Sequence, residues 1–216
     1  MLDNRKSLKD YIESSLKNTQ ATIAQLAKDP ALMQQLEQAI GTVVQCFQGT
    51  NKVLFAGNGG SAADAQHMSA EFISRFMFDR PGLPSIALTT DTSAITAIGN
   101  DYGFELLFAR QVQALGQSGD VLIAYSTSGT SPNILRGLEV AKQKNVTTIG
   151  LTGMRPESET MAALCDVILR VPSCDTPQIQ EGHLVLGHLL CGAVEQQLFG
   201  QLKAEQETKE AQMEAS

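Results

Sequence analysis

The sequence lacks the features that mark several large classes of protein. Its formal net charge is −7, and no basic cluster is long enough to follow a nucleic-acid backbone. No apolar run approaches about 18 residues, and the amino-terminal stretch has no apolar segment of the secretory type. These absences argue against nucleic-acid partners and against insertion into a membrane, so we expect a soluble, cytoplasmic protein.

Cysteine is also scarce, and its placement excludes a disulfide scaffold. The four cysteines include no CxxC pair, and their spacings match no disulfide framework. Cys46, Cys165 and Cys191 lie in apolar surroundings, which is typical of buried free thiols. A reducing compartment follows, in agreement with the cytoplasm.

Apolar residues, by contrast, are plentiful enough for one full core. They make up 43% of the 216 residues, which suits a single domain. Two helical patterns lead the chain, the first ending at Asp29-Pro30 and the second running from about Pro30 to Phe47. Short apolar runs then alternate with helix-like stretches. The runs are 53–56, 85–88, 121–124, 147–151 and 167–171; the helix-like stretches are 62–78, 92–115, 132–144, 157–164 and a long one over about 178–202.

This alternation predicts an α/β fold. Continuous apolar strands separated by helices indicate a parallel sheet covered on both faces. We therefore predict one domain over residues 1–216, a three-layer α/β/α, doubly wound, flavodoxin-like arrangement of five parallel strands. Its parts are leading helices in 1–48, a core with a final helix in 50–202, and a polar tail in 203–216 that we expect to fray. Ligands in such folds bind beyond the carboxyl ends of the strands, where strand order reverses.

The loop after the third predicted strand is rich in hydroxyl groups. Its sequence over residues 126–131 is STSGTS, and Pro132 follows where a helix can begin. Hydroxyls, backbone N–H groups and a helix N-terminus together can hold a phosphate without any lysine or arginine. The alternative is an ordinary Ser/Thr cap of the helix. The number of hydroxyls favours binding of an anion.

The loop after the first predicted strand is rich in glycine. Gly57, Gly59 and Ala62 match the pattern G-x-G-x-x-A of a dinucleotide site. That pattern also needs an acidic residue about 20 residues on, whereas the next strand here ends at Asp91, about thirty residues on. The alternative is that Asn58, Gly59, Gly60 and Ser61 donate hydrogen bonds to a sugar phosphate.

Only three histidines occur in the chain, and all three lie in segments that leave or face the predicted ligand end. His67 and Glu71 share a helix face, while Gln180 and His188 are two helical turns apart. Imidazole, carboxylate and amide oxygen can together hold a divalent ion such as zinc. By spacing alone, however, such a His/Glu pair is more often a solvated contact on a helix surface. The spacing also leaves open whether His183 and Glu181 point inward instead.

Four stretches together make the sequence similar to a known family. They are GNGGSAADAQHMSAEF, LTTDTSAITAIGNDYGFE, STSGTSPN and IQEGHLVLGH. In this order, over roughly residues 50–195, they resemble the bacterial phosphoheptose isomerases of the sugar-isomerase (SIS) fold. The residues before IQE, Cys174 to Gln178, belong to a variable part of that family, so no acid or base is carried over there.

The resemblance implies a site and a cofactor. It implies a homotetramer with active sites at subunit contacts and one zinc ion per subunit. The zinc ligands carry over to His67, Glu71, Gln180 and His188. The substrate contacts carry over to Asn58, Gly59, Gly60, Ser61, Glu71, Asn100, Asp101, Ser126, Thr127, Ser128, Ser131 and Gln180.

The resemblance also implies an activity. The expected reaction turns sedoheptulose 7-phosphate into D-glycero-D-manno-heptose 7-phosphate through an enediol, the first step toward ADP-heptose and the lipopolysaccharide core. Glu71 is expected to remove the proton and His188 to act as the complementary acid and base. Asp64 either orients His67 or serves as an acid in the first helical turn. The alternatives are a non-catalytic tetramer that binds a protein partner, as replication-initiator-associating relatives do, and a sugar-phosphate sensor.

Overall fold

A computed structural model describes residues 7–214 of the chain, and it contains the predicted sheet. Five parallel strands pair in the order β2-β1-β3-β4-β5, so the flavodoxin-like prediction is confirmed. The strands are β1 (Val53–Ala56), β2 (Ser85–Ala87), β3 (Val121–Tyr125), β4 (Thr147–Thr152) and β5 (Val167–Arg170). Strand order reverses between β1 and β3, which places the glycine-rich loop and the hydroxyl-rich loop beside each other.

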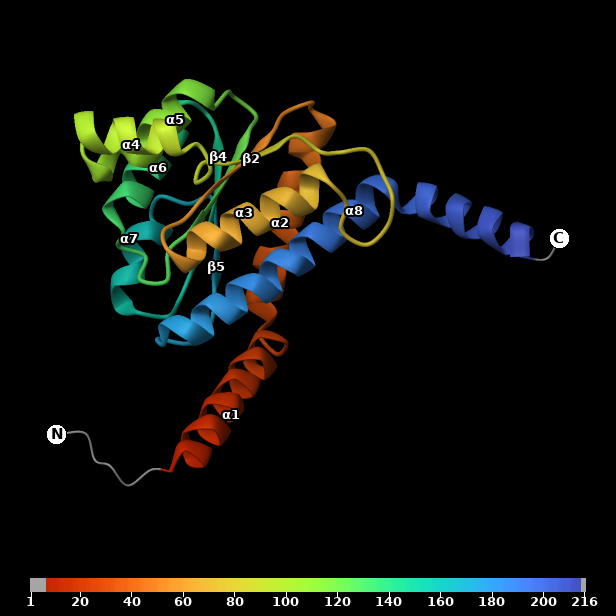
Figure 1. Ribbon diagram of the computed structural model, residues 1–216, viewed down its shortest axis with the longest axis horizontal. Helices are drawn as coiled ribbons and strands as arrows, with labels where there is room; N and C mark the ends of the chain where they lie inside the picture. The colour runs from red at the N-terminus through yellow and green to blue at the C-terminus, as the bar shows by residue number, and fades with distance from the viewer. Residues whose placement is uncertain (1–6, 215–216) are drawn as a thin grey trace.

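Helices cover both faces of this sheet (Figure 1). One face carries α2, α3 and α8, and the other carries α4 to α7. The helices are α1 (Leu8–Leu26), α2 (Pro30–Gln48), α3 (Gly60–Ile73), α4 (Thr92–Asp101), α5 (Leu107–Leu115), α6 (Pro132–Gln143), α7 (Glu159–Ala162) and α8 (Thr176–Glu214), with short 3₁₀ turns at η1 (Phe104–Leu106) and η2 (Pro156–Ser158). None of the helices in residues 7–214 is long and apolar enough to cross a membrane.

The two leading helices begin at sequence-encoded caps. Ser7 and Asp10 form a reciprocal capping box at the start of α1. Asp29 accepts hydrogen bonds from two backbone N–H groups of α2, and Pro30 occupies its first position. While α2 packs on the sheet, α1 extends away from the body of the molecule (Figure 1).

The sheet divides the core into two clusters. Successive side chains of a strand point to opposite faces, so Phe55 of β1 joins the cluster under α2, α3 and α8, whereas Leu54 joins the cluster under α5 and α6. The strands β1 and β3 are buried along their whole length. This explains why the sequence shows them as uninterrupted apolar runs.

Several predicted boundaries were wrong. The helix-like stretch 92–115 is three elements, because Gly103 adopts a φ of 88° and breaks the helix. The stretch 62–78 is helical only to Ile73. There the buried Arg80 side chain donates hydrogen bonds to the carbonyls of Glu71 and Phe72 in the last turn. The stretch 157–164 is a 3₁₀ turn followed by a four-residue helix.

The carboxyl-terminal prediction was also wrong. The final helix does not end near Leu202 but continues to Glu214, so the tail is helical rather than frayed within the described residues. The tail contains no glycine or proline and is rich in alanine, glutamate, glutamine and lysine, all of which favour helix. Gln206 also donates a hydrogen bond to the carbonyl of Asp79.

Candidate active site

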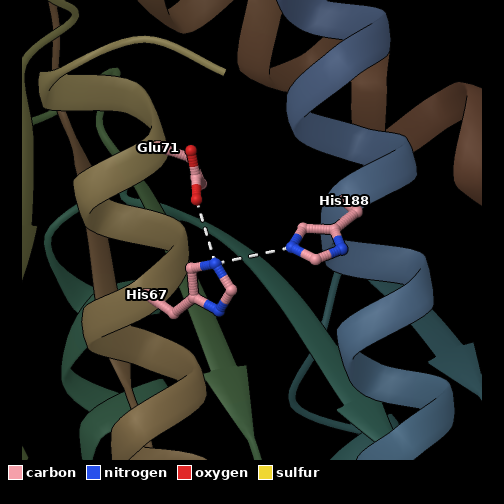
Figure 2. A group of neighbouring side chains, drawn as sticks. All are labelled: His67, Glu71 and His188. Carbon is pink, nitrogen blue, oxygen red and sulfur yellow. Dashed lines mark hydrogen bonds and ion pairs between the residues drawn. The ribbon is translucent and has the colours of Figure 1, made fainter. Parts of the chain in front are cut away.

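Three side chains suited to metal binding or proton transfer meet between α3 and α8. His67 and Glu71 lie one turn apart on α3, and His188 faces them from α8 (Figure 2). His67 Nε2 is 2.9 Å from Glu71 Oε1 and 3.5 Å from His188 Nε2. The structure thus brings together three of the four predicted metal ligands.

Aromatic contacts hold His188 in this group. Its ring stacks on Phe76, with centroids 5.3 Å apart, and meets the ring of His67 edge-on at 5.0 Å. The side chain of Glu71 is 22% exposed and that of His67 is 43% exposed. The cluster is therefore fixed by packing yet open to solvent, so a substrate can reach it.

The donor set and its spacing fit a divalent metal. The ligand atoms of His67, Glu71 and His188 all lie within 4.8 Å of one another. Zinc binds imidazole nitrogen at about 2.0–2.1 Å, so tetrahedral ligand atoms lie about 3.3 Å apart. The observed 3.5 Å between the two imidazole nitrogens is close to that value. Two imidazoles and one carboxylate also match the donors found in catalytic zinc sites, which keep one position open.

Gln180, the fourth predicted ligand, lies apart from the His67–Glu71–His188 group. Its amide packs against Gly60 at the start of α3, where a Cβ on Gly60 would come within 2.5 Å of Gln180 Nε2. Residues eight apart on a helix are about 12 Å apart along its axis, which separates Gln180 from His188. Among the described residues no hydrogen bond joins Gln180 to the His67–Glu71–His188 group.

The other polar residues that compete for the inner face of α8 have different surroundings. His183 is fully buried against Tyr125. Burial lowers its pKa to about 4, an effect that the backbone of Thr152 partly offsets. Glu181 is exposed and accepts a hydrogen bond from Thr19. His188, not His183, is therefore the histidine that faces α3, a choice that spacing alone left open.

Asp64 makes no hydrogen bond to His67 that would orient the ring. One oxygen of its carboxyl is buried without a partner. Burial raises the pKa of this carboxyl, and the nearby His67 partly offsets that effect. The proposed orienting role of Asp64 is therefore not visible as a direct contact.

The conformation of the turn before α3 explains why glycines occur there. Gly59 has a φ of 57°, a conformation that favours glycine, and it stands at the N-cap of α3. A Cβ on Gly57 would lie 2.2 Å from the carbonyl oxygen of Ser61. The glycine pattern thus serves the tight turn and the close approach of α8, and it does not require a dinucleotide.

The hydroxyl-rich loop after β3 forms a compact turn at the start of α6. Ser126 Oγ lies 3.0 Å from Ser131 Oγ and accepts a hydrogen bond from the N–H of Gly129, whose φ is 69°. Ser131 is the N-cap of α6, yet its side chain makes no capping bond. The simple capping alternative is therefore wrong for Ser131, and its hydroxyl remains directed into the loop with that of Ser126.

A residue that sequence reasoning passed over joins the two loops. Asn133, at the second position of α6, exchanges two hydrogen bonds with Asn58, and both distances are 2.8 Å. Asn133 stood within a motif of the resemblance, but no role was assigned to it. The only signal in the sequence is an asparagine at the start of a predicted helix, and such asparagines are common.

Asn100 and Asp101 do not join the other predicted substrate residues. They are exposed at the far end of α4, and the Asn100 amide donates a hydrogen bond to Asp101. α4 packs on η1 and α5, on the opposite face of the sheet from α8 (Figure 1). A single chain therefore leaves these two residues apart from the His67–Glu71–His188 group.

Comparison with known proteins gives consistent matches. A family model described as "SIS domain" matches residues 15–153. A protein named phosphoheptose isomerase from Burkholderia pseudomallei (strain 1710b) is 57% identical, over 88% of this chain and 95% of its own. The structure of a phosphoheptose isomerase from Neisseria gonorrhoeae has a TM-score of 0.80 and 41% identity, over 88% of this chain and 99% of that one. A phosphoheptose isomerase from Francisella tularensis gives a TM-score of 0.83 and 38% identity, over 88% and 100%.

Proposed function

Because this chain belongs to the phosphoheptose isomerase family of SIS-domain proteins, we propose that it converts D-sedoheptulose 7-phosphate into D-glycero-D-manno-heptose 7-phosphate. This isomerisation of a ketose to an aldose is the first step toward ADP-heptose and the lipopolysaccharide core. The observation that carries the proposal is the convergence of Glu71 and His188 from facing helices. A carboxylate and an imidazole are the two groups that a proton transfer between adjacent carbons needs.

The two groups divide the proton transfers between them. Glu71 removes the proton from C1 of the open-chain ketose, and an enediol forms. His188 moves a proton from the C1 hydroxyl to the C2 oxygen, and the protonated Glu71 returns its proton to C2, which leaves the aldose and restores both groups. The contact with His67 uses Glu71 Oε1 alone, so Oε2 is the atom available for the sugar proton. The stacking of Phe76 on His188 keeps the imidazole facing this carboxylate.

The two loops at the switch point supply the binding groups. Ser126, Thr127, Ser128 and Ser131 belong to the loop that leads into the amino end of α6, where hydroxyls and N–H groups favour an anion. We assign the phosphate of the sugar to this loop. Asn58 to Ser61 face it from the amino end of α3 and are assigned to the sugar hydroxyls, together with Gln180.

We further propose one zinc ion per subunit at this site. His67, Glu71 and His188 would hold it, with Gln180 as a fourth ligand if its side chain turns away from Gly60 or comes from another subunit. When bound, zinc supplies Lewis-acid polarisation of the carbonyl and hydroxyl oxygens of the sugar. A carboxylate bound firmly to a metal is a weaker base, so the two roles of Glu71 would be reconciled by ligand exchange during turnover or by a metal that mainly orders the site.

Incubation with sedoheptulose 7-phosphate tests both proposals. We expect NMR to detect the aldose product with the untreated protein, a loss of most turnover in the presence of a chelator, and its recovery on addition of zinc. Turnover that a chelator does not change would overturn the metal assignment alone. No product even with added zinc would overturn the isomerase and favour a protein-binding or sugar-phosphate-sensing role.

We also propose that the sites are completed in a homotetramer. Its support is the apolar stripe of α1, which projects from the body and leaves large side chains exposed at helical spacing: Leu8 (75%), Tyr11 (65%), Ile12 (48%) and Leu16 (67%). The separation of Asn100 and Asp101 from the other site residues points the same way, because another subunit can bring them in.

Light scattering should therefore give four times the mass of one chain. Replacing both Ile12 and Leu16 with aspartate should lower that mass, because the charges would have to be buried in the contact. A monomer with full activity would contradict the proposal.

We place the protein in the cytoplasm, since its four cysteines are all unpaired; recovery from another fraction of the cell would overturn that.

A further inference from the structure

The side chains of Asn58 and Asn133 form a reciprocal amide pair. Asn58 Nδ2 donates to Asn133 Oδ1, and Asn133 Nδ2 donates to Asn58 Oδ1, with both distances at 2.8 Å. Asn133 is only 2% exposed, while Asn58 is half-buried at the end of β1. Because each amide supplies one donor and one acceptor, a rotation of either amide by a half turn would break both bonds.

The pair joins the two loops that we assign to the substrate. β1 and β3 are neighbours in the sheet, with Ala56 paired to Ala124, so the loops that follow them diverge from adjacent points. Asn58 belongs to the first loop, and Asn133 lies two residues after Ser131 of the second. The amide pair is a side-chain link across the point where strand order reverses.

The link also determines what Asn58 can offer to a ligand. Its carbonyl oxygen and one N–H are directed at Asn133, so the second N–H of Nδ2 is the donor left for the open side. Without Asn133, the amide of Asn58 could rotate and present an oxygen to a sugar hydroxyl or a phosphate. An oxygen there could no longer donate to a sugar oxygen, and it would repel a phosphate lying close to it.

We propose that Asn133 is a positioning residue of the isomerase. It fixes the orientation of the Asn58 amide and couples the glycine-rich loop to the hydroxyl-rich loop, so that the sugar and the phosphate are held in one register. This inference rests on the proposed function. It assigns to Asn133 an effect on substrate affinity and not on the chemical step.

The test uses N133D, because its carboxyl changes character with pH. A protonated carboxyl has one O–H donor and one carbonyl acceptor, so it restores both bonds to Asn58, whereas the ionised form has no donor. Burial raises the pKa of a carboxyl above its ordinary value of about 3.9, which brings the change toward the range where an enzyme can be assayed. Arg136 and Glu139, the first charged residues after Asn133 along α6, pair with each other on the exposed face.

We expect the KM of N133D for sedoheptulose 7-phosphate to be about tenfold higher than that of the wild type at pH 8. As the pH falls, the ratio of the two KM values should return toward one, with kcat changed much less. The uncharged N133S cannot rebuild the pair, so its KM should be raised at every pH. N145D, the same change at an exposed asparagine beyond the other end of α6, should match the wild type throughout.

Two outcomes would overturn the inference. A KM of N133S equal to that of the wild type would mean that only the added charge matters in N133D. Variants that melt at a lower temperature but keep a wild-type KM would reduce Asn133 to a structural role. If turnover is too slow, calorimetric binding of the sugar phosphate gives the same comparison. An inactive wild type would instead overturn the proposed function.

Discussion

Replacing Glu71 with glutamine should lower kcat for the isomerisation by about 10³-fold or more while the sugar phosphate still binds. The substitution keeps the shape of the side chain and removes the group that accepts the proton, and general base catalysis contributes about 10²- to 10⁴-fold. His188→Ala should have a similar effect, because the imidazole 3.5 Å from His67 would be lost from the group. KM should change little in both variants, since the phosphate is assigned to a different loop.

The variants also separate the role of Glu71 as a base from its role as a ligand. The capacity to bind zinc should be measured beside kcat. A variant that binds zinc as the wild type does but loses turnover has lost a base, and one that loses both has lost a ligand. Glu139→Gln is a matched control, because Glu139 is a solvated glutamate on α6 that pairs only with Arg136. Turnover near the wild-type rate in E71Q or H188A would refute the assignment of the catalytic pair.

Of the substitutions considered for stability, removal of Arg80 should lower the free energy of unfolding most. Its guanidinium and the carboxylate of Glu195 are both fully buried, with Nε and Oε1 3.0 Å apart. Arg80 also donates to the carbonyls of Glu71 and Phe72 at 2.7 Å, and Glu195 accepts from the N–H groups of Phe76 and Met77. This ion pair thus joins the end of α3, the loop that follows and α8.

Arg80→Met should therefore lower the free energy of unfolding by about 3–5 kcal/mol, because it leaves a buried carboxylate without its partner. For a chain of this size, each kcal/mol shifts Tm by about 2–4 °C, so calorimetry should record a loss of roughly 10 °C. Arg136→Met provides the control, since the Arg136–Glu139 pair is solvated and its loss should leave Tm nearly unchanged.

A second variant shows whether the buried charge is the cause. The double replacement of Arg80 by methionine and Glu195 by leucine removes both charges, so it should be more stable than Arg80→Met alone. The prediction fails if Arg80→Met unfolds at the wild-type temperature. It also fails if the double variant is no more stable than the single one, which would assign the effect to the lost backbone contacts.

Much of the fold could be predicted because burial leaves a direct record in the sequence. β1 and β3 are buried along their length, so their apolar runs stand out, and Pro30 marks the start of α2. The break at Gly103 was missed because a lone glycine in an otherwise periodic stretch does not reveal a positive φ. The helical tail was missed because its polarity was taken as fraying, although its residues favour helix.

The site could be predicted only in part, because spacing defines a helix face and not its neighbours. The i,i+4 positions of His67 and Glu71 place them together on any helix. Whether His188 or His183 meets them depends on how α8 is rotated against α3, which is a property of packing. Asn58 and Asn133 are 75 residues apart in the sequence, and the residues around each of them do not predict the contact.

The contact surface between α3 and α8 sets a fixed distance for the chemistry. Besides Gly60 against Gln180, a Cβ on Gly187 would meet Met68 Sδ at 2.5 Å, so at both glycines a side chain of the facing helix packs directly on the backbone. Gly187 directly precedes His188, and Met68 directly follows His67. Close packing at these neighbouring residues therefore helps to set the distance between the two histidines. A substitution that widens this interface should abolish turnover although every catalytic side chain is still present, because it would move His188 away from His67 and Glu71.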